Sequence, residues 1–237
     1  MKVLITDNIN KCVKDIISET AEAVFLPTMS EEEIIKIIGE YDALMVRSQT
    51  KVNRNIIEAG KKLKIIGRAG VGVDNIDVNS ATEKGIIVVN SPDGNTIAAS
   101  EHTIALMLAI SRNIVPASQS TKEGKWNRDA FTGTELFGKT LGVMGFGRIG
   151  RKVVNIALSI GMKVIVYDPF ANEEMVNKKG ALYETSLDNF LKTLDYLSIH
   201  IPKTSDTINI INKENINKMK KGAIIINCSR GGLVNEN

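Results

Sequence analysis

The sequence has little of several residue types on which other classes of protein depend. Its 237 residues include only two cysteines, Cys12 and Cys228, and two histidines. The cysteines lie far apart and form no C-x-x-C pair, which excludes a disulfide framework and a zinc site. Sparse, unpaired cysteine is typical of a reducing compartment, so we expect a cytoplasmic protein without a bound metal.

Charge of one sign and long apolar runs are also scarce. The 30 Lys and Arg residues exceed the 27 Asp and Glu residues by only +3. That excess is too small to indicate nucleic acid or an anionic membrane as a partner. No apolar run reaches the length of a membrane-spanning helix, and Asp7 lies too close to the N-terminus for a signal peptide.

Strand and helix patterns alternate over the first part of the chain. Short β-branched runs predict strands at Val3–Thr6, Ala23–Leu26, Ala43–Val46, Leu63–Gly67 and Ile86–Val89. Helical patterns occupy Asn10–Thr20, Ser30–Gly39, Asn53–Ala59 and Asn75–Lys84. Such alternation predicts a parallel, doubly wound α/β sheet.

A second alternating series follows a loop at Ser91–Asn95 and a long apolar helix predicted at Ile97–Val115. That helix is either the link between two lobes or a core helix of one of them. The later strands are predicted at Thr140–Met144, Lys163–Tyr167, Tyr196–Ile199 and Ala223–Asn227, with helices at Arg148–Ile160, Glu173–Lys179, Ser186–Leu191 and Lys213–Met219. We therefore expect two lobes, residues 1–96 and 97–237, with a ligand cleft at their junction.

The strongest motif is the segment G-F-G-R-I-G at residues 145–150. It follows the predicted strand Thr140–Met144 and opens a helical pattern, and the next predicted strand leads directly into Asp168. A strand, a glycine turn, a helix, a second strand and an acid in this order are typical of a dinucleotide-binding unit. The three glycines permit the tight turn, the approach of a pyrophosphate and the packing of the helix on the sheet. Asp168 can accept hydrogen bonds from ribose hydroxyls and would repel a 2′-phosphate, which favours NAD over NADP.

Arginines follow three of the predicted strands. Arg230 comes after the strand ending at Asn227, while Arg47 and Arg68 come after two strands of the first lobe. Because the carboxyl ends of parallel strands form the ligand crevice, these guanidinium groups are candidates for holding an anionic substrate. The alternative for each is a solvated surface arginine. His200 ends another strand and either contacts the cofactor or simply caps that strand.

Several segments together resemble the D-isomer-specific 2-hydroxyacid dehydrogenases. They run from the first strand to the last residue and include Val46–Val52, Gly67–Asn75, Asn90–Thr96, Ala99–Thr103, Gly124–Trp126, Gly145–Gly150, Tyr167–Pro169 and Asn227–Gly232. The resemblance implies a flavodoxin-like substrate-binding lobe and a Rossmann NAD-binding lobe. The first three segments lie in the first lobe and favour the branch of the family that acts on 3-phosphoglycerate.

The resemblance also implies roles for individual residues. Arg230 matches the catalytic arginine that orients the substrate carboxylate and carbonyl. Substrate contacts are implied for Arg47, Ser48, Arg68 and Gly70. Cofactor contacts are implied for Gly145, Gly147, Arg148, Ile149, Gly150, Asp168, His200, Ile201, Pro202, Cys228, Ser229 and Arg230.

The implied reaction is hydride exchange between NAD and a phosphorylated 2-hydroxy acid, the oxidation of 3-phosphoglycerate that begins serine synthesis. One alternative keeps the chemistry but changes the substrate to glyoxylate, hydroxypyruvate or another 2-keto acid. A second is a non-catalytic, NAD-sensing interaction protein on the same fold. The family commonly forms dimers, so we expect a homodimer or homotetramer. In the family, the catalytic Glu and His follow the Arg230 motif, and a final segment returns to complete the first lobe. We expect all of these beyond Asn237, so the first lobe lacks its returning segment and the NAD-binding lobe is truncated. We therefore expect a fragment with negligible turnover.

Overall fold

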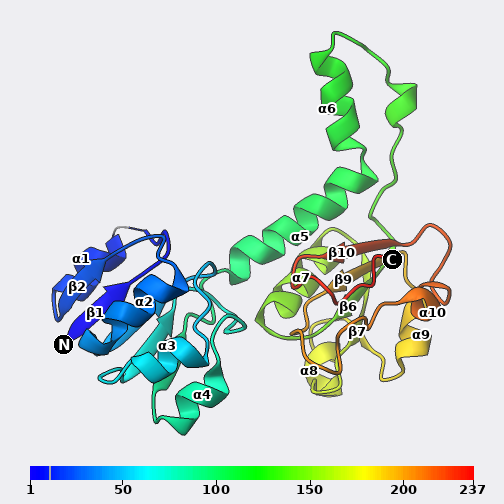
Figure 1. Ribbon diagram of the computed structural model, residues 1–237. Coiled ribbons are helices and arrows are strands. Elements are labelled where there is room, and N and C mark those ends of the chain that lie inside the picture. Colours follow the sequence, from blue (N-terminus) through cyan, green and yellow to red (C-terminus); the bar gives the residue numbers. More distant parts are fainter. Residues whose placement is uncertain (11) are drawn as a thin grey trace. The chain divides into compact units, whose positions relative to one another are not determined.

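The computed structural model describes residues 1–10 and 12–237. It divides the chain into two compact units, Met1–Asn95 and Thr96–Asn237. Each unit is an α/β sandwich around one five-stranded parallel sheet (Figure 1). The two units are described separately below.

The sheet of the first unit contains β1 (Lys2–Ile5), β2 (Glu22–Phe25), β3 (Ala43–Val46), β4 (Ile65–Arg68) and β5 (Ile87–Asn90). The strands pair in parallel in the order β2-β1-β3-β4-β5. This is the flavodoxin-like order, which confirms the predicted fold of this unit. The order reverses direction at β1 and β3, and ligands of such sheets bind beyond the carboxyl ends of the strands at that point.

Helices cover both faces of the first sheet. They are α1 (Cys12–Ser18), α2 (Glu31–Ile37), the 3-10 turn η1 (Ile38–Glu40), α3 (Arg54–Ala59) and α4 (Val78–Glu83). Alternate residues of each strand face opposite ways. Leu4, Leu44 and Ile66 therefore pack with α2, α3 and α4, whereas Val3 and Ile5 pack with α1 on the other face.

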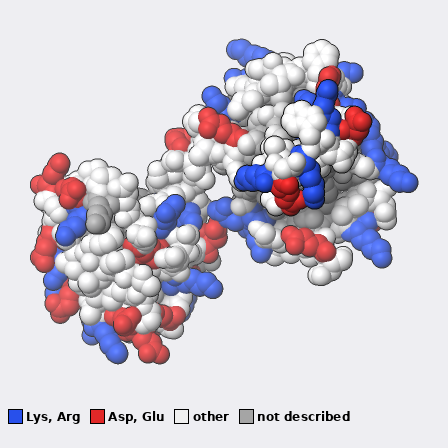
Figure 2. All heavy atoms as spheres, turned by 90° about the horizontal axis from the view of Figure 1, so that it is seen from above, with Lys and Arg blue, Asp and Glu red and all other residues white. Residues whose placement is uncertain are grey.

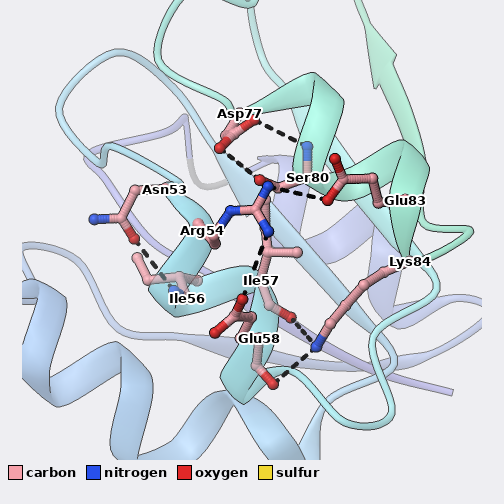
Figure 3. A network of polar contacts seen from close by, with 9 residues as sticks. All are labelled: Asn53, Arg54, Ile56, Ile57, Glu58, Asp77, Ser80, Glu83 and Lys84. Atoms are coloured by element: carbon pink, nitrogen blue, oxygen red, sulfur yellow. Dashed lines mark hydrogen bonds and ion pairs between the residues drawn. The ribbon is translucent and has the colours of Figure 1, made fainter.

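Helices α3 and α4 are joined by polar contacts as well as by the core (Figure 3). The Arg54 guanidinium lies 3.0 Å from a Glu83 carboxylate oxygen and 3.8 Å from one of Glu58. The Lys84 ammonium donates to the backbone carbonyls of Ile57, at 3.4 Å, and Glu58, at 3.1 Å. These carbonyls belong to the last turn of α3, where a cation is favourable. The network links the two helices on their solvent-exposed surface.

The sheet of the second unit contains β6 (Thr140–Met144), β7 (Lys163–Tyr167), β8 (Leu182–Tyr183), β9 (Tyr196–Ile199) and β10 (Ile224–Asn227). The parallel order is β10-β9-β6-β7-β8. Numbered from β6, this is the Rossmann order 3-2-1-4-5 read from the other edge. The predicted Rossmann lobe is thus confirmed, and its ligand crevice is expected between the ends of β6 and β9.

The second unit contains the helices α5 (Thr96–Ser111), α6 (Ile114–Lys122), the 3-10 turn η2 (Asp129–Phe131), α7 (Arg148–Ser159), α8 (Glu173–Asn177), α9 (Leu187–Lys192) and α10 (Lys213–Ile216). Helix α6 has no buried residue and extends away from the sheet (Figure 1). Val153 and Ala157 of α7 pack with Met107 of α5 in one core cluster. Phe190 and Leu191 of α9 belong to the cluster on the opposite face.

The prediction of a single helix at Ile97–Val115 is wrong, because two helices, α5 and α6, occupy this segment. Asn113 adopts the left-handed conformation, with φ 50° and ψ 35°, and separates α5 from α6. Asparagine tolerates this conformation better than other non-glycine residues, and its side chain donates to the Thr132 carbonyl at 3.3 Å. Helix α5 is a core helix of the second unit, contributing Ile104 and Met107 to the core. It also begins at Thr96, directly after the boundary between the two units.

Surface charge is mixed on the face drawn in Figure 2, where basic and acidic side chains are interspersed. No helix within residues 1–10 and 12–237 is both long enough and apolar enough to cross a lipid bilayer.

Candidate functional site

The glycine turn of the second unit leads from β6 into α7 and lies against the carboxyl end of β9. Gly145 has φ +98°, a conformation that favours glycine. A Cβ at this position would come within 2.6 Å of the His200 carbonyl oxygen. His200 is itself tied to β6, since its N–H donates to the Met144 carbonyl at 2.7 Å. Gly145 and His200, both predicted to contact the cofactor, therefore lie against each other at the switch point of the sheet.

The other two glycines of the motif have contrasting surroundings. A Cβ at Gly150 would collide with the carbonyl oxygen of Gly145, so α7 packs on the turn only because Gly150 lacks a side chain. A Cβ at Gly147 would meet no atom of the described chain within 4 Å. Gly147 also precedes the first turn of α7, where backbone N–H groups without helical acceptors favour an anion. The space beside Gly147 can thus admit a phosphate group.

Asp168 follows β7 directly and holds the glycine turn in place. One carboxylate oxygen accepts from the Phe146 N–H at 2.7 Å, and the other accepts from the Phe170 N–H at 2.8 Å. The Asp168 carbonyl accepts from the Tyr183 hydroxyl at 2.9 Å, which links this residue to β8. Each carboxylate oxygen keeps a further lone pair. The half-buried carboxylate can therefore still accept a hydrogen bond from a ribose hydroxyl.

His200 is held as a neutral imidazole. Its Nε2 atom lies 2.7 Å from the hydroxyl of Ser198, a residue that is completely buried in β9. Burial lowers the pKa of His200 to about 4, because the charged ring would lose its hydration. Ile201 and Pro202 follow at the surface, and the Pro202 carbonyl accepts from the Thr207 hydroxyl at 2.7 Å. This segment offers a neutral edge to the crevice.

Arg230 lies in a turn beyond the end of β10. Asn227 organises the turn: its amide nitrogen donates to the Arg230 carbonyl at 2.8 Å, and its oxygen accepts from the Ser229 N–H at 3.1 Å. The half-buried Arg230 donates to the Ser229 carbonyl at 2.9 Å. Cys228 packs against the core under the turn. Arg230 is thus placed at the carboxyl edge of the second sheet.

The first unit brings Arg47, Arg68 and Gly70 together at the carboxyl ends of β3 and β4. Arg68 Nε donates to the Arg47 carbonyl at 3.2 Å. The Arg68 guanidinium also covers Gly70, since a Cβ there would lie 2.9 Å from Nη1. Arg47 and Ser48 are exposed beside them. The Arg68 side chain is thus held against the main chain of Arg47 at this edge.

Two residues of this edge were missed by the sequence analysis. Asp7, at the end of β1, is 2% exposed, and its carboxylate binds the loop that carries Arg47. Asn75 donates to the Arg47 carbonyl at 2.9 Å. Asp7 had a usable signal, because a polar residue directly after a buried strand falls at the ligand edge of a parallel sheet. Asn75 ends the segment Gly67–Asn75 that resembles the family, but its contact with Arg47, far away in sequence, depends on the fold.

A metal is not suggested by the side chains present. In the part of the chain that the structure describes, three or more His, Cys, Asp or Glu side chains nowhere gather into a group that could hold an ion.

Comparison with known proteins identifies the second unit. A family model described as the NAD binding domain of D-isomer specific 2-hydroxyacid dehydrogenases matches residues 104–237. The glycine turn, Asp168, His200 and Arg230 all fall within the matched residues.

Whole-chain relatives extend the likeness to the first unit. The chain is 52% identical over 235 residues to a D-3-phosphoglycerate dehydrogenase of Synechocystis. The matched residues make up 99% of this chain and 42% of that protein. The chain is 50% identical over 208 residues to a hydroxypyruvate reductase of Thermotoga maritima, over 88% of this chain and 67% of that protein. The chain spans less than half of the Synechocystis protein's length.

Solved structures agree with the fold. The chain superposes on an NAD+-bound 3-phosphoglycerate dehydrogenase of Entamoeba histolytica with a TM-score of 0.81 and 32% identity, covering 99% of this chain and 74% of that one. With the family model and the strand orders of both sheets, this likeness leads to one conclusion. The chain belongs to the D-isomer-specific 2-hydroxyacid dehydrogenases, and residues 104–237 are the family's NAD-binding domain.

Proposed function

We propose that the second unit binds NAD across the carboxyl edge of β6, β7, β9 and β10. The open space at Gly147 and the N-terminus of α7 suit the pyrophosphate, and Asp168 suits the adenosine ribose. A 2′-phosphate would meet the negative charge of Asp168, so NAD is favoured over NADP. The proposed contacts are Gly145, Gly147, Arg148, Ile149, Gly150, Asp168, His200, Ile201, Pro202 and the segment Cys228–Arg230.

The first unit, in this proposal, is the substrate-binding lobe of an enzyme that oxidises 3-phosphoglycerate to 3-phosphohydroxypyruvate. Arg47, Ser48 and Arg68 bind anionic groups of the substrate, and Gly70 leaves room for Arg68. Arg230 is the catalytic arginine, whose planar guanidinium holds a carboxylate through two parallel hydrogen bonds and polarises the neighbouring carbonyl. NAD, when bound, would accept the hydride from the substrate's hydroxyl-bearing carbon, and the hydroxyl proton would pass to a general base.

One observation carries the choice of a phosphorylated substrate: Arg68 reaches across to the Arg47 carbonyl, which places two arginines at one sheet edge. Two guanidinium groups stabilise a dianionic phosphate more than they stabilise a singly charged carboxylate. The Synechocystis relative, named for 3-phosphoglycerate, is consistent with this choice.

Replacement of Arg47 tests the proposal. Arg47→Gln should raise the Kd for 3-phosphohydroxypyruvate, measured by calorimetry on the 237-residue chain, roughly ten- to a hundredfold, the range expected for losing hydrogen bonds to a charged group. The Kd for unphosphorylated hydroxypyruvate should change much less. Arg54→Gln, an exposed arginine of the same unit, is the control. An equal rise for both substrates would reject the phosphate-binding role.

A second candidate function is the reduction of hydroxypyruvate, glyoxylate or another 2-keto acid. The Thermotoga maritima relative named hydroxypyruvate reductase favours it. In that case Arg47→Gln would leave the preference between the two substrates unchanged. A non-catalytic NAD-sensing role would instead leave NAD binding intact without binding of either acid.

A homodimer or homotetramer is also part of the proposal. It is supported by exposed apolar side chains on α5, α6 and the segment after α6: Ile110, Ile114, Val115 and Trp126, which are 49–82% exposed. Patches of this kind mark protein interfaces. Light scattering of the purified chain measures the assembly, and a monomer at micromolar concentration would reject it. We also propose a cytoplasmic location, supported by the free cysteines Cys12 and Cys228.

A further inference from the structure

Asp7 is a buried carboxylate with an unusual backbone. Asp7 lies at the carboxyl end of β1 and has φ 61°, in the left-handed region. Only 2% of its surface is exposed. Asp is one of the few residues that adopt this conformation, because its side chain can hydrogen-bond locally. A buried ionised group requires several hydrogen bonds to replace its hydration. The donors that Asp7 uses reveal what it does.

Within residues 1–10 and 12–237, the donors to the Asp7 carboxylate come from one loop, residues 47–50. The Arg47 N–H donates at 2.7 Å, the Gln49 N–H at 3.1 Å and the Thr50 N–H at 3.0 Å. The Thr50 hydroxyl is a fourth donor. One carboxylate therefore holds three backbone amides of the loop that follows β3.

The carbonyls of the same loop are held from a different segment. The Asn75 amide nitrogen donates to the Arg47 carbonyl at 2.9 Å and to the Thr50 carbonyl at 2.7 Å. Arg68 adds its bond to the Arg47 carbonyl. The main chain of Arg47 is thus fixed at its N–H by Asp7 and at its carbonyl by Asn75 and Arg68.

This arrangement decides how the loop can recognise a ligand. Three of its amides are already used by Asp7, so they cannot bind an anion themselves. The Ser48 N–H is not bound by Asp7, and with the exposed side chains of Arg47 and Ser48 it remains for that purpose. The loop lies at the reversal point of the first sheet, between β1 and β3, where ligands of such sheets bind.

We propose that Asp7 is a positioning residue for substrate. It orders the loop at residues 47–50 and thereby directs the Arg47 guanidinium toward the anionic group of the substrate. The inference rests on the proposed function, in which Arg47 binds that group, and adds a residue that acts only through Arg47.

Asp7→Asn separates positioning from simple electrostatics. Removing a negative charge near two arginines would by charge alone tighten the binding of an anion. Asn keeps one acceptor but turns the other into a donor facing backbone N–H groups, so the loop should loosen. We expect the Kd for 3-phosphoglycerate, measured by calorimetry on the 237-residue chain, to rise roughly ten- to a hundredfold, as for other misplaced binding groups. Amide hydrogen exchange at Gln49 and Thr50 should accelerate at the same time.

Asp42→Asn is the matched control. Asp42 is a carboxylate of the same unit that accepts from the Lys2 N–H at 2.8 Å, at the opposite ends of β1 and β3. Its replacement should leave the Kd within about twofold, since it touches nothing at the carboxyl edge. Should Asp7→Asn fail to fold, Thr50→Val keeps the carboxylate and removes the hydroxyl that donates to Asp7, together with its 3.1 Å contact with the Thr6 hydroxyl. It should raise the Kd roughly threefold.

The outcomes are separable. An unchanged or lower Kd in folded Asp7→Asn, or unchanged exchange at Gln49 and Thr50, would overturn the inference. A parent chain that does not bind 3-phosphoglycerate would count against the proposed function. The exchange comparison would then still decide whether Asp7 orders the loop.

Discussion

Asp168 and Phe146 are joined by a 2.7 Å hydrogen bond from the backbone N–H of Phe146 to the Asp168 carboxylate. The residue expected to select the cofactor therefore also fixes the turn that is expected to bind its phosphates. Substitution at position 168 should affect both properties at once.

Asp168→Asn should lower the affinity for NAD roughly tenfold, because the loss of a charged acceptor weakens the ribose contact and loosens the turn. The affinity for NADP should fall less or rise, since the repulsion of a 2′-phosphate disappears. Fluorescence titration with NADH and NADPH measures the ratio. The control is Asp188→Asn, a surface carboxylate of α9 paired with Lys218 at 2.8 Å. An unaltered ratio would contradict the assigned role of Asp168.

The glycines of the motif should separate binding from folding. Gly147→Ala adds a methyl group in open space, so the melting temperature should barely change. If a phosphate occupies that space, NAD affinity should drop by roughly 1–3 kcal/mol, as for other overpacked contacts. Gly150→Ala forces a methyl group onto the Gly145 carbonyl and should destabilise the unit itself by roughly 1–3 kcal/mol or more. Thermal unfolding and NADH titration of both variants test this, and weak NAD binding only in Gly150→Ala would refute it.

Stability should depend on pH through His200. Its folded-state pKa of about 4 lies below the usual value of 6.5, so the unfolded chain binds the proton more readily. The stability is complete above pH 6.5 and is lost as the pH falls toward 4. Between pH 7 and pH 5 the loss should be about 2 kcal/mol, from 1.36 kcal/mol for each pKa unit.

Urea unfolding at several pH values measures this slope. His200→Gln should flatten it, whereas His102→Gln, at the other and exposed histidine, should not. A slope that persists in His200→Gln would assign the titration to other groups.

The polar network between α3 and α4 should contribute less to stability than the core beneath it. Arg54→Ala removes two ion pairs whose side chains are 55–61% exposed, and water and salt screen such pairs. We expect a loss below about 1 kcal/mol. Ile57→Ala empties a completely buried position of the same helix and should destabilise by roughly 2–5 kcal/mol. Urea unfolding of the two variants compares them directly, and a larger effect of Arg54→Ala would reverse the order.

The sequence predicted most of the strands because their apolar runs are buried on both faces of a parallel sheet. The bounds of β6, β7 and β9 agree with the prediction to the residue. The two-residue strand β8 was not predicted, because it owes its existence to pairing with β7 rather than to a pattern of its own.

The helix break at Asn113 could not be read from hydrophobic spacing either, since the apolar residues continue across it. The contacts of Asp7 depend on which strands become neighbours. That information appears only once β1 lies beside β3. The glycine motif, by contrast, encodes its site locally, and the residues named from it gather at one sheet edge.

The boundary at Asn95 and Thr96 has a consequence for evolution and engineering. All five strands of each sheet come from one side of it. A crossover by recombination at this point would exchange the five described strands of one sheet without cutting a hydrogen-bonded ladder. A chimaera joined there tests whether acid preference travels with the first unit while the NAD-binding domain is kept unchanged.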